Sequence, residues 1–156
     1  MGLSGEIARV KGEPRMLVIV VHGFIELMVN ALIDAKCKKA RKINENRQDF
    51  SHSVKLVILY EMGLLSETLY CHLDFFRGLR NQASHQVVFE VTKNELSWLK
   101  NARYREPENF HELCLTILSS FWNKHLRVFE PAFMHSEFGD DPTRTKGRRT
   151  GSNPTS

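Results

Sequence analysis

The chain has 156 residues, of which 42% are hydrophobic and 10% aromatic. A chain of this length and composition can bury one core without disulfides or metals, which argues against global disorder and favours one globular domain. The formal net charge of +4 equals the four basic residues within 142–156, where there are no acids, so the rest of the chain is formally neutral. The charge of the body therefore indicates no polyanionic partner by itself.

Disulfide-rich, exported and membrane-spanning proteins are also disfavoured. Cys37, Cys71 and Cys114 are far apart and form no Cys-x-x-Cys pair, so we expect reduced thiols and neither a disulfide framework nor a cysteine zinc site. The N-terminal residues lack the pattern of a secretory signal. The most apolar stretch, residues 16–33, contains ionisable side chains, which are costly at bilayer depth, so we interpret it as a buried core helix. We expect a cytoplasmic protein that does not contact membranes.

A first long helix is predicted over residues 14–39. Pro14 suits a first helical turn, and the apolar residues after it recur with helical spacing. The other faces of this helix are apolar too, except for one polar line, which consists of His22, Glu26 and Asn30. These residues are four apart, so they stack on one stripe of the helix.

Two antiparallel helices are predicted next. Ser51 or Ser53 is expected to cap the first of them, which Gly63 ends. After a short turn, Ser66 caps the second, and the short turn makes the two helices pack against each other. The apolar stripe of this second helix consists of five residues, namely Leu69, Leu73, Phe76, Leu79 and Ala83.

The next segment, residues 87–91, is short and β-branched and predicts an extended connector. Thr92 and Glu95 then form a capping box for a short helix. After Pro107 the apolar stripe over residues 110–129 predicts a last long helix.

These elements predict an all-α fold. Nothing alternates with strands and no repeat period is visible, so a single up-and-down bundle of four to five helices is the simplest architecture. We place this helical domain at residues 1–135. Residues 136–156 are rich in Gly, Pro, Ser and Thr, and we expect them to form a disordered basic tail.

Arg80 falls within the apolar arc of the third predicted helix, near Leu73 and Phe76 on a helical wheel. An unpaired buried guanidinium is very costly, so Arg80 must face an acid, a solvent cleft or a ligand anion. Glu26, on the polar line, is the candidate acid. A purely structural Arg80–Glu26 pair and an Arg80 side chain that reaches out to water both remain open.

This helix ends with the segment RNQASH, in which Arg80 and Asn81 are followed by three residues and then by His85. The segment MGLLSETLYCHLDFFRGL precedes it and itself follows another predicted helix. Together they resemble the signature of the HEPN (higher eukaryotes and prokaryotes nucleotide-binding) superfamily, in which Arg and a polar residue, often Asn, precede His by a few positions. The resemblance extends to the branch around the mannitol operon repressor-like proteins, and it implies an HEPN-like helical bundle.

The resemblance implies one of two functions of different classes. Many HEPN domains are metal-independent endoribonucleases that act as toxins or in defence against phage, with Arg and His forming a composite site across a symmetric dimer. Others are non-catalytic binding or regulatory modules, as the mannitol operon repressor-like branch suggests. Because the motif is intact here, we expect the nuclease. RNA is then its substrate, a homodimer its assembly, and an antitoxin or regulatory protein a further partner.

The chemistry of metal-independent RNA cleavage suits these residue types. It needs a base for the 2′-hydroxyl proton, an acid for the leaving oxygen and positive charge on the phosphorane. We expect His85 to be an acid or base, Arg80 to hold phosphate oxygens, and Asn81 to orient His85 or the phosphate. One histidine cannot easily be both acid and base, and Arg80 and His85 are about 140° apart on one helix. Both points favour two chains that face one another.

Other sites are less well supported. A basic cluster within residues 36–47 is a candidate for docking the RNA backbone, and it includes Lys36, Lys38, Lys39, Arg41 and Lys42. The alternative is a solvated helix end, since cations complement the dipole there. We expect no cofactor, because the chain has no phosphate-binding glycine loop. We expect no metal, because His22 and Glu26 provide only two ligands.

Overall fold

The computed structural model describes residues 2–137, and every regular element in that part of the chain is helical. The α-helices are α1 Leu3–Val10, α2 Pro14–Lys36, α3 Ala40–Glu45, α4 His52–Glu61, α5 Glu67–His85, α6 Lys93–Leu96, α7 Phe110–Lys124 and α8 Leu126–Glu137, and two 3-10 helices are η1 Ala102–Arg105 and η2 Pro107–Asn109. The predicted all-α class is therefore confirmed. Of the predicted tail over 136–156, the first two residues end α8, and the others lie outside the described residues.

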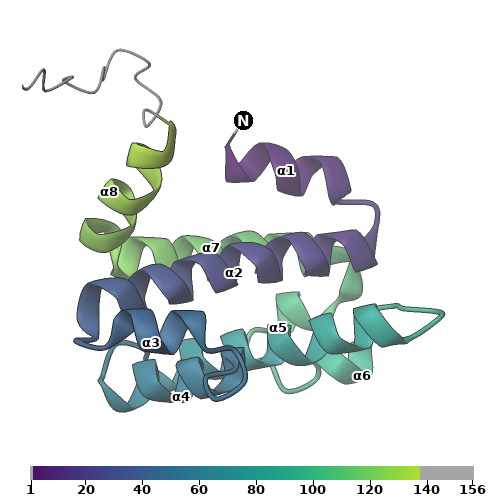
Figure 1. Cartoon of the computed structure of the whole chain (residues 1–156). Coiled ribbons are helices and arrows are strands. Elements are labelled where there is room, and N and C mark those ends of the chain that lie inside the picture. Colours follow the sequence, from purple (N-terminus) through teal and green to yellow (C-terminus); the bar gives the residue numbers. More distant parts are fainter. Residues whose placement is uncertain (1, 138–156) are drawn as a thin grey trace, which may run out of the picture.

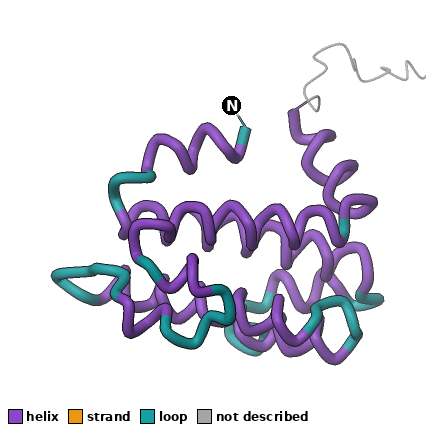
Figure 2. The backbone as a smooth tube through the Cα atoms, turned by 180° about the vertical axis from the view of Figure 1, so that it is seen from behind, coloured by secondary structure: helices purple, strands orange, loops and turns teal. Residues whose placement is uncertain are grey.

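The central element is α2, on which most other helices pack. In Figure 1, α1 and α8 lie on one side of α2, α3 to α6 lie on the other, and α7 runs alongside it; Figure 2 gives the view from behind. Fully buried apolar side chains of α2 form the middle of the core, among them Val18, Val21, Ile25, Val29 and Leu32. Burying such side chains is the main favourable contribution to folding.

By length and composition alone, α2 could also cross a membrane. Half of its most apolar 18-residue window is buried by other parts of the described chain. A core helix of this kind has the same composition as a membrane span because it is surrounded by apolar partners on most sides.

The N-termini of the long helices lie where the sequence predicts them. Pro14 is in the first turn of α2. Ser51 caps α4 and Ser66 caps α5, and each accepts a hydrogen bond at Oγ from the backbone N–H three residues later. Thr92 and Glu95 form the predicted capping box at α6. Each cap satisfies a backbone donor that has no partner within its helix.

The turn between α4 and α5 is built on Gly63. This glycine has a φ of 72°, which an L side chain rarely adopts, and the N–H of Leu64 donates to the carbonyl of Leu59 at 2.9 Å. The 6→1 hydrogen bond and left-handed glycine form a Schellman motif, which ends α4. Because the turn is short, α4 and α5 pack antiparallel.

Three features differ from the sequence prediction. α1 lies in a segment for which no element was predicted, and its Ile7 is 2% exposed and joins the core. α3 occupies part of the predicted loop but buries no residue. The last long helix is broken at His125, whose φ of −123° and ψ of 32° are not helical, so two helices replace one. The Nε2 atom of His125 lies 2.7 Å from the carbonyl oxygen of Leu64, which ties this break to the α4–α5 turn.

Residues 86–92 form the predicted extended connector and contain no helix or strand. The connector follows α5 directly and projects from the body of the protein (Figure 1). Val87 and Val88 at its tip are 94% and 75% exposed, whereas Phe89 and Val91 are buried and anchor its far end.

Candidate functional site

The segment RNQASH forms the last turns of α5. The apolar stripe predicted for this helix is confirmed, because all five of its members are buried: Leu69, Leu73, Phe76, Leu79 and Ala83. α5 continues as an unbroken α-helix through His85. Side chains five residues apart on such a helix point about 140° apart, so Arg80 and His85 of one chain diverge.

Arg80 shares the arc of the buried Leu73 on α5, but its side chain is exposed, which agrees with the alternative in which it reaches out to water. α4, which packs beside α5, begins at His52 near Arg77, and Arg80 lies about 4.5 Å further along α5, past the end of α4. Within residues 2–137, the Arg80 side chain makes no hydrogen bond or ion pair, and the ion-pair contact of Glu26 is with His22 at 4.0 Å. The structural Arg80–Glu26 pair is therefore not present.

Asn81 and His85 are exposed as well, and neither side chain has a hydrogen-bond partner in the described part of the chain. The C-terminus of α5 is held by Arg15 at the start of α2, whose guanidinium donates to the carbonyls of Gln86 and Val87 at 2.8 Å each. Arg15 therefore fixes the direction in which the chain leaves α5, while the side chains of Arg80, Asn81 and His85 have no hydrogen-bond partner among the described residues.

Two histidines lie beside this segment, of which His22 is buried and His52 is partly buried. His22 on α2 and His52 at the start of α4 pack with their rings 4.8 Å apart at 65°. Burial lowers the pKa of His22, and the charges of Arg80 and Arg77 lower it further against the opposing effect of Glu26. Burial, together with the neighbouring charges, lowers the pKa of His52 to about 3. Both imidazoles are therefore neutral near pH 7.

The polar line of α2 continues from these histidines into a small pocket. Glu26 and Asn30 line this pocket of about 260 Å³, together with His52, Arg47 and Lys55. Lys55 is 6% exposed, and its Nζ donates to Oδ1 of Asn30 at 2.8 Å. Burial lowers the pKa of Lys55, the charge of Arg47 lowers it further, and Glu26 opposes both. Two of the three residues of the predicted polar line, Glu26 and Asn30, therefore line a pocket to which α4 also contributes.

The five predicted RNA-docking residues are all exposed, at the C-terminus of α2 and around α3: Lys36, Lys38, Lys39, Arg41 and Lys42. Arg41 makes an ion pair with Glu45 at 2.9 Å, which offsets part of the positive charge. Because 21 residues of helix separate Arg15 from Lys36, this cluster lies about 30 Å from the end of α5 along α2. The small polar pocket lies between the two.

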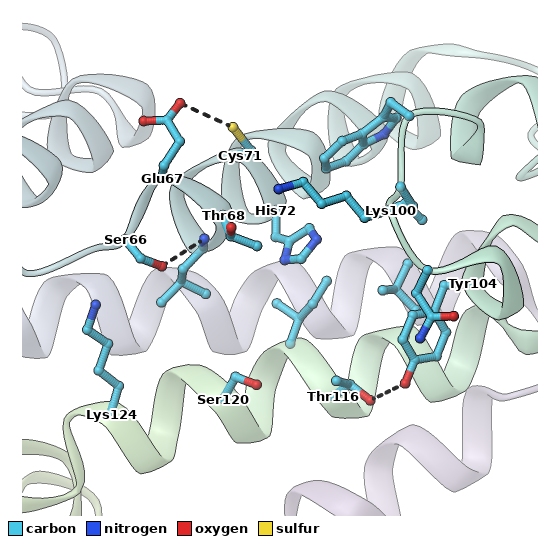
Figure 3. A pocket seen from close by; sticks show the side chains of 16 residues that line it. Ser66, Glu67, Thr68, Cys71, His72, Lys100, Tyr104, Thr116, Ser120 and Lys124 are labelled. Atoms are coloured by element: carbon cyan, nitrogen blue, oxygen red, sulfur yellow. Dashed lines mark hydrogen bonds between the residues drawn. The ribbon is translucent and has the colours of Figure 1, made fainter.

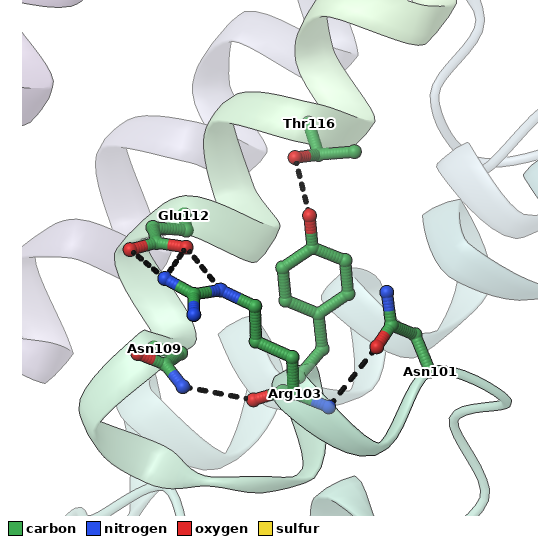
Figure 4. Close-up of polar contacts among 6 residues, drawn as sticks. Asn101, Arg103, Asn109, Glu112 and Thr116 are labelled. Carbon is green, nitrogen blue, oxygen red and sulfur yellow. Dashed lines mark hydrogen bonds and ion pairs between the residues drawn. The ribbon is translucent and has the colours of Figure 1, made fainter.

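A larger and mainly apolar cavity of about 470 Å³ lies at the other end of α5 (Figure 3). It is enclosed by the first turns of α5, by η1 and by α7, and Figure 3 shows His72 and Tyr104 on its walls. Figure 4 shows how η1 is held on α7: Arg103 binds Glu112 through two hydrogen bonds of 2.8 Å, and the hydroxyl of Tyr104 lies 3.0 Å from that of Thr116. This cavity contains none of the predicted site residues.

Sequence reasoning missed three members of the polar region beside RNQASH, namely His52, Lys55 and Arg77. They lie on α4 and α5, at least 25 residues from their partners on α2 along the chain, and no short motif connects them. Their only local signal is the cap Ser51, which places His52 in a first helical turn.

Comparisons with protein-family models, with curated proteins and with solved structures found no match to this chain.

Proposed function

We propose that this chain is a metal-independent endoribonuclease of the HEPN type, acting as a toxin or in defence against phage. One observation supports this best: Arg80, Asn81 and His85 lie together at the end of α5, exposed and without hydrogen bonds or ion pairs to the described residues. Polar side chains that stabilise a fold are usually paired with other groups of that fold. These three are available to a substrate instead.

Each residue has a role in the proposed reaction. The guanidinium of Arg80 binds two phosphate oxygens and stabilises the negative charge that develops on the phosphorane. His85 transfers a proton as general acid or base, the role that histidine takes most often in enzymes. The amide of Asn81 orients the phosphate or His85. The second proton transfer falls to the His85 of another chain.

A homodimer brings two such segments together. Because α5 is unbroken through His85, Arg80 and His85 of one chain cannot converge on one phosphate, and a two-fold axis near RNQASH supplies the missing partner. Val87 and Val88 follow the motif directly and are almost fully exposed, as the apolar centre of an interface would be in the isolated chain. We place the dimer contact on this tip.

The basic cluster of residues 36–47 is proposed to dock the RNA backbone away from the site of cleavage. Arg47 of this cluster lines the polar pocket, and Lys55 lies next to it. From there the polar line of α2 leads toward Arg80, whose charge acts on His22. An RNA strand that follows this line meets cations at both ends, which favours binding through phosphates.

RNA cleavage in EDTA tests the proposal. Purified protein should degrade a single-stranded RNA, and His85→Gln should lower the rate by about 10²- to 10⁴-fold, the usual contribution of a general acid or base. His111→Gln, the same substitution at a partly buried histidine of α7, is the matched control and should leave the rate unchanged. If the wild-type protein does not cleave RNA, the alternative of a non-catalytic module of the mannitol operon repressor-like kind replaces the nuclease. If His85→Gln cleaves RNA at the wild-type rate, His85 is not the catalytic group and the proposed site is wrong.

A further inference from the structure

Three potential metal ligands converge between α2 and α4. His22 and Glu26 are one turn apart on α2, and His52 is the first residue of α4. One ligand atom from each of the three lies within 4.8 Å of the other two. The side chain of His22 is 5% exposed and that of Glu26 is 50% exposed, so the group extends from the core to the surface.

The two histidines have unused nitrogen atoms. Nε2 of His22 and Nε2 of His52 are both buried, and neither has a hydrogen-bond partner among the described residues. Buried polar atoms in folded proteins are nearly always paired, so two unpaired nitrogens on rings whose centroids are 4.8 Å apart indicate a missing partner. A neutral imidazole has one ring nitrogen with a lone pair, which can bind a metal ion.

We propose that His22, Glu26 and His52 bind one divalent transition-metal ion of the zinc type. Two imidazole nitrogens and one carboxylate oxygen suit zinc, which prefers nitrogen, sulfur and oxygen ligands in a tetrahedral arrangement. The fourth ligand is water, which reaches the ion from the pocket of about 260 Å³ that Glu26 and His52 line. The site therefore has three protein ligands and one open position, unlike structural zinc sites, which are closed by four protein ligands.

The distances require only small side-chain movements. Ligand atoms around tetrahedral zinc are about 3.4 Å apart, given metal–ligand distances of about 2.1 Å. The three groups must therefore approach one another by no more than about 1.4 Å from their separation of up to 4.8 Å. The side chain of Glu26 is half-exposed, so it is the least constrained of the three groups.

The surrounding charges set the strength of binding. His22 lies in the field of Arg77 and Arg80, and His52 lies in the field of Lys55 and Arg77. All of these cations oppose the positive charge of a bound metal ion. Arg77 is neutralised in part by Asp74, 2.7 Å from its Nε. The carboxylate of Glu26 supplies the remaining compensation, which makes it the ligand on which binding depends most.

This site doesn't depend on the proposed RNA cleavage, which requires no metal. Zinc would join α2 to α4 and occupy the buried nitrogens beside Arg80. Cleavage in EDTA tests His85, whereas metal binding without RNA tests His22, Glu26 and His52, so either idea can fail without the other.

Titration of the metal-free full-length chain with Zn²⁺, against a chromophoric chelator, tests the proposal. We expect one Zn²⁺ per chain, a melting temperature that rises with Zn²⁺ concentration, and visible absorption of the Co²⁺-substituted protein typical of tetrahedral nitrogen and oxygen ligands. Glu26→Gln and His52→Gln should each weaken Zn²⁺ binding by at least about 10- to 100-fold, which is the usual effect of losing a residue that only hydrogen-bonds to a metal ligand.

Two controls keep this result interpretable. His72→Gln removes a partly buried histidine of α5 outside the cluster and should bind Zn²⁺ like wild type. Glu26→Gln changes a half-exposed side chain, so it should keep the wild-type melting temperature without metal and lose only the increase with Zn²⁺. The proposal is wrong if wild type binds no stoichiometric Zn²⁺, if both ligand variants bind as wild type does, or if the Co²⁺ spectrum shows thiolate ligation by a cysteine.

Discussion

Arg80 is unpaired, unlike Arg77 and Lys55, which also lie near the histidine pair of α2 and α4. Arg77 is paired with Asp74 at 2.7 Å, and Lys55 donates to Asn30 at 2.8 Å. Arg80 is exposed, and its side chain makes no hydrogen bond or ion pair to the described residues. An exposed guanidinium next to neutral imidazoles keeps its full charge and geometry for an incoming phosphate.

This placement predicts the effect of Arg80→Ala. The free energy of unfolding should change by no more than about 0.5 kcal/mol, because the side chain has no partner to strand, whereas cleavage of RNA in EDTA should be lost. Thermal unfolding and a cleavage assay on the same preparation measure both. Arg127→Ala, at an exposed cation of α8, is the control and should change neither. A loss of about 3 to 5 kcal/mol would instead indicate the buried Arg80–Glu26 pair that the sequence left open.

At the scale of elements, the junction of α7 and α8 depends on one histidine. His125 ends α7, and its Nε2 lies 2.7 Å from the carbonyl oxygen of Leu64 in the α4–α5 turn. Its ring also packs edge-on against Phe121 and Phe129. Burial lowers the pKa of His125, and the hydrogen bond to Leu64 opposes this effect. The folded protein therefore favours the neutral ring.

The lowered pKa of His125 predicts that acid destabilises this junction. Above pH 6.5, the ordinary histidine pKa, the neutral ring of His125 makes its full contribution to the free energy of unfolding. As the pH falls below 6.5, the unfolded chain binds the proton before the folded chain does, so the free energy of unfolding decreases. His125→Gln keeps an amide donor for Leu64 but cannot titrate. In denaturant unfolding from about pH 7 to about pH 5, the free energy of unfolding should decrease less steeply for His125→Gln than for wild type. The difference in slope should be a fraction of ~1.4 kcal/mol per pH unit, which is the limit for one titrating group. Parallel curves for the two proteins would contradict this assignment.

Much of the fold was predictable from local signals. Caps at Ser51 and Ser66, the glycine at Gly63 and the apolar stripe of α5 each depend on side chains and backbone within one helix, so the sequence alone contains them. The break at His125 was not predictable, because its apolar pattern continues across the break and the deciding contact is 61 residues away along the chain.

The site was predictable only in part, and Arg80 shows why. A helical wheel assumes that neighbours cover a helix from one fixed direction over its whole length. Here Leu73 is fully buried, whereas Arg80 on the same arc, seven residues later, is in solvent. The contact between His52 and His22 could not be predicted either, because it depends on how α2 and α4 pack.

At the scale of the whole molecule, the proposed catalytic groups and the exposed apolar residues lie at the same end. RNQASH ends α5, and Arg15 directs the chain out of it. The connector that follows projects from the body of the protein (Figure 1) and contains the exposed Val87 and Val88. A contact through the tip would bring the catalytic groups of two chains together. Assembly and activity should therefore depend on the same few residues.

Mixing experiments can show whether two histidines serve one site. If each site needs His85 from both chains, wild type mixed with an equal amount of His85→Gln should have about half the activity of the same wild-type protein alone, because half of its chains enter inactive heterodimers. A His85→Gln chain that also carries Val87→Glu and Val88→Glu is the control. Charged tips should not pair, so sedimentation should show a monomer and the wild-type activity should not decrease. Undiminished activity in the first mixture, with chain exchange verified, would mean that each chain cleaves RNA with its own histidine, and the two-chain site would have to be abandoned.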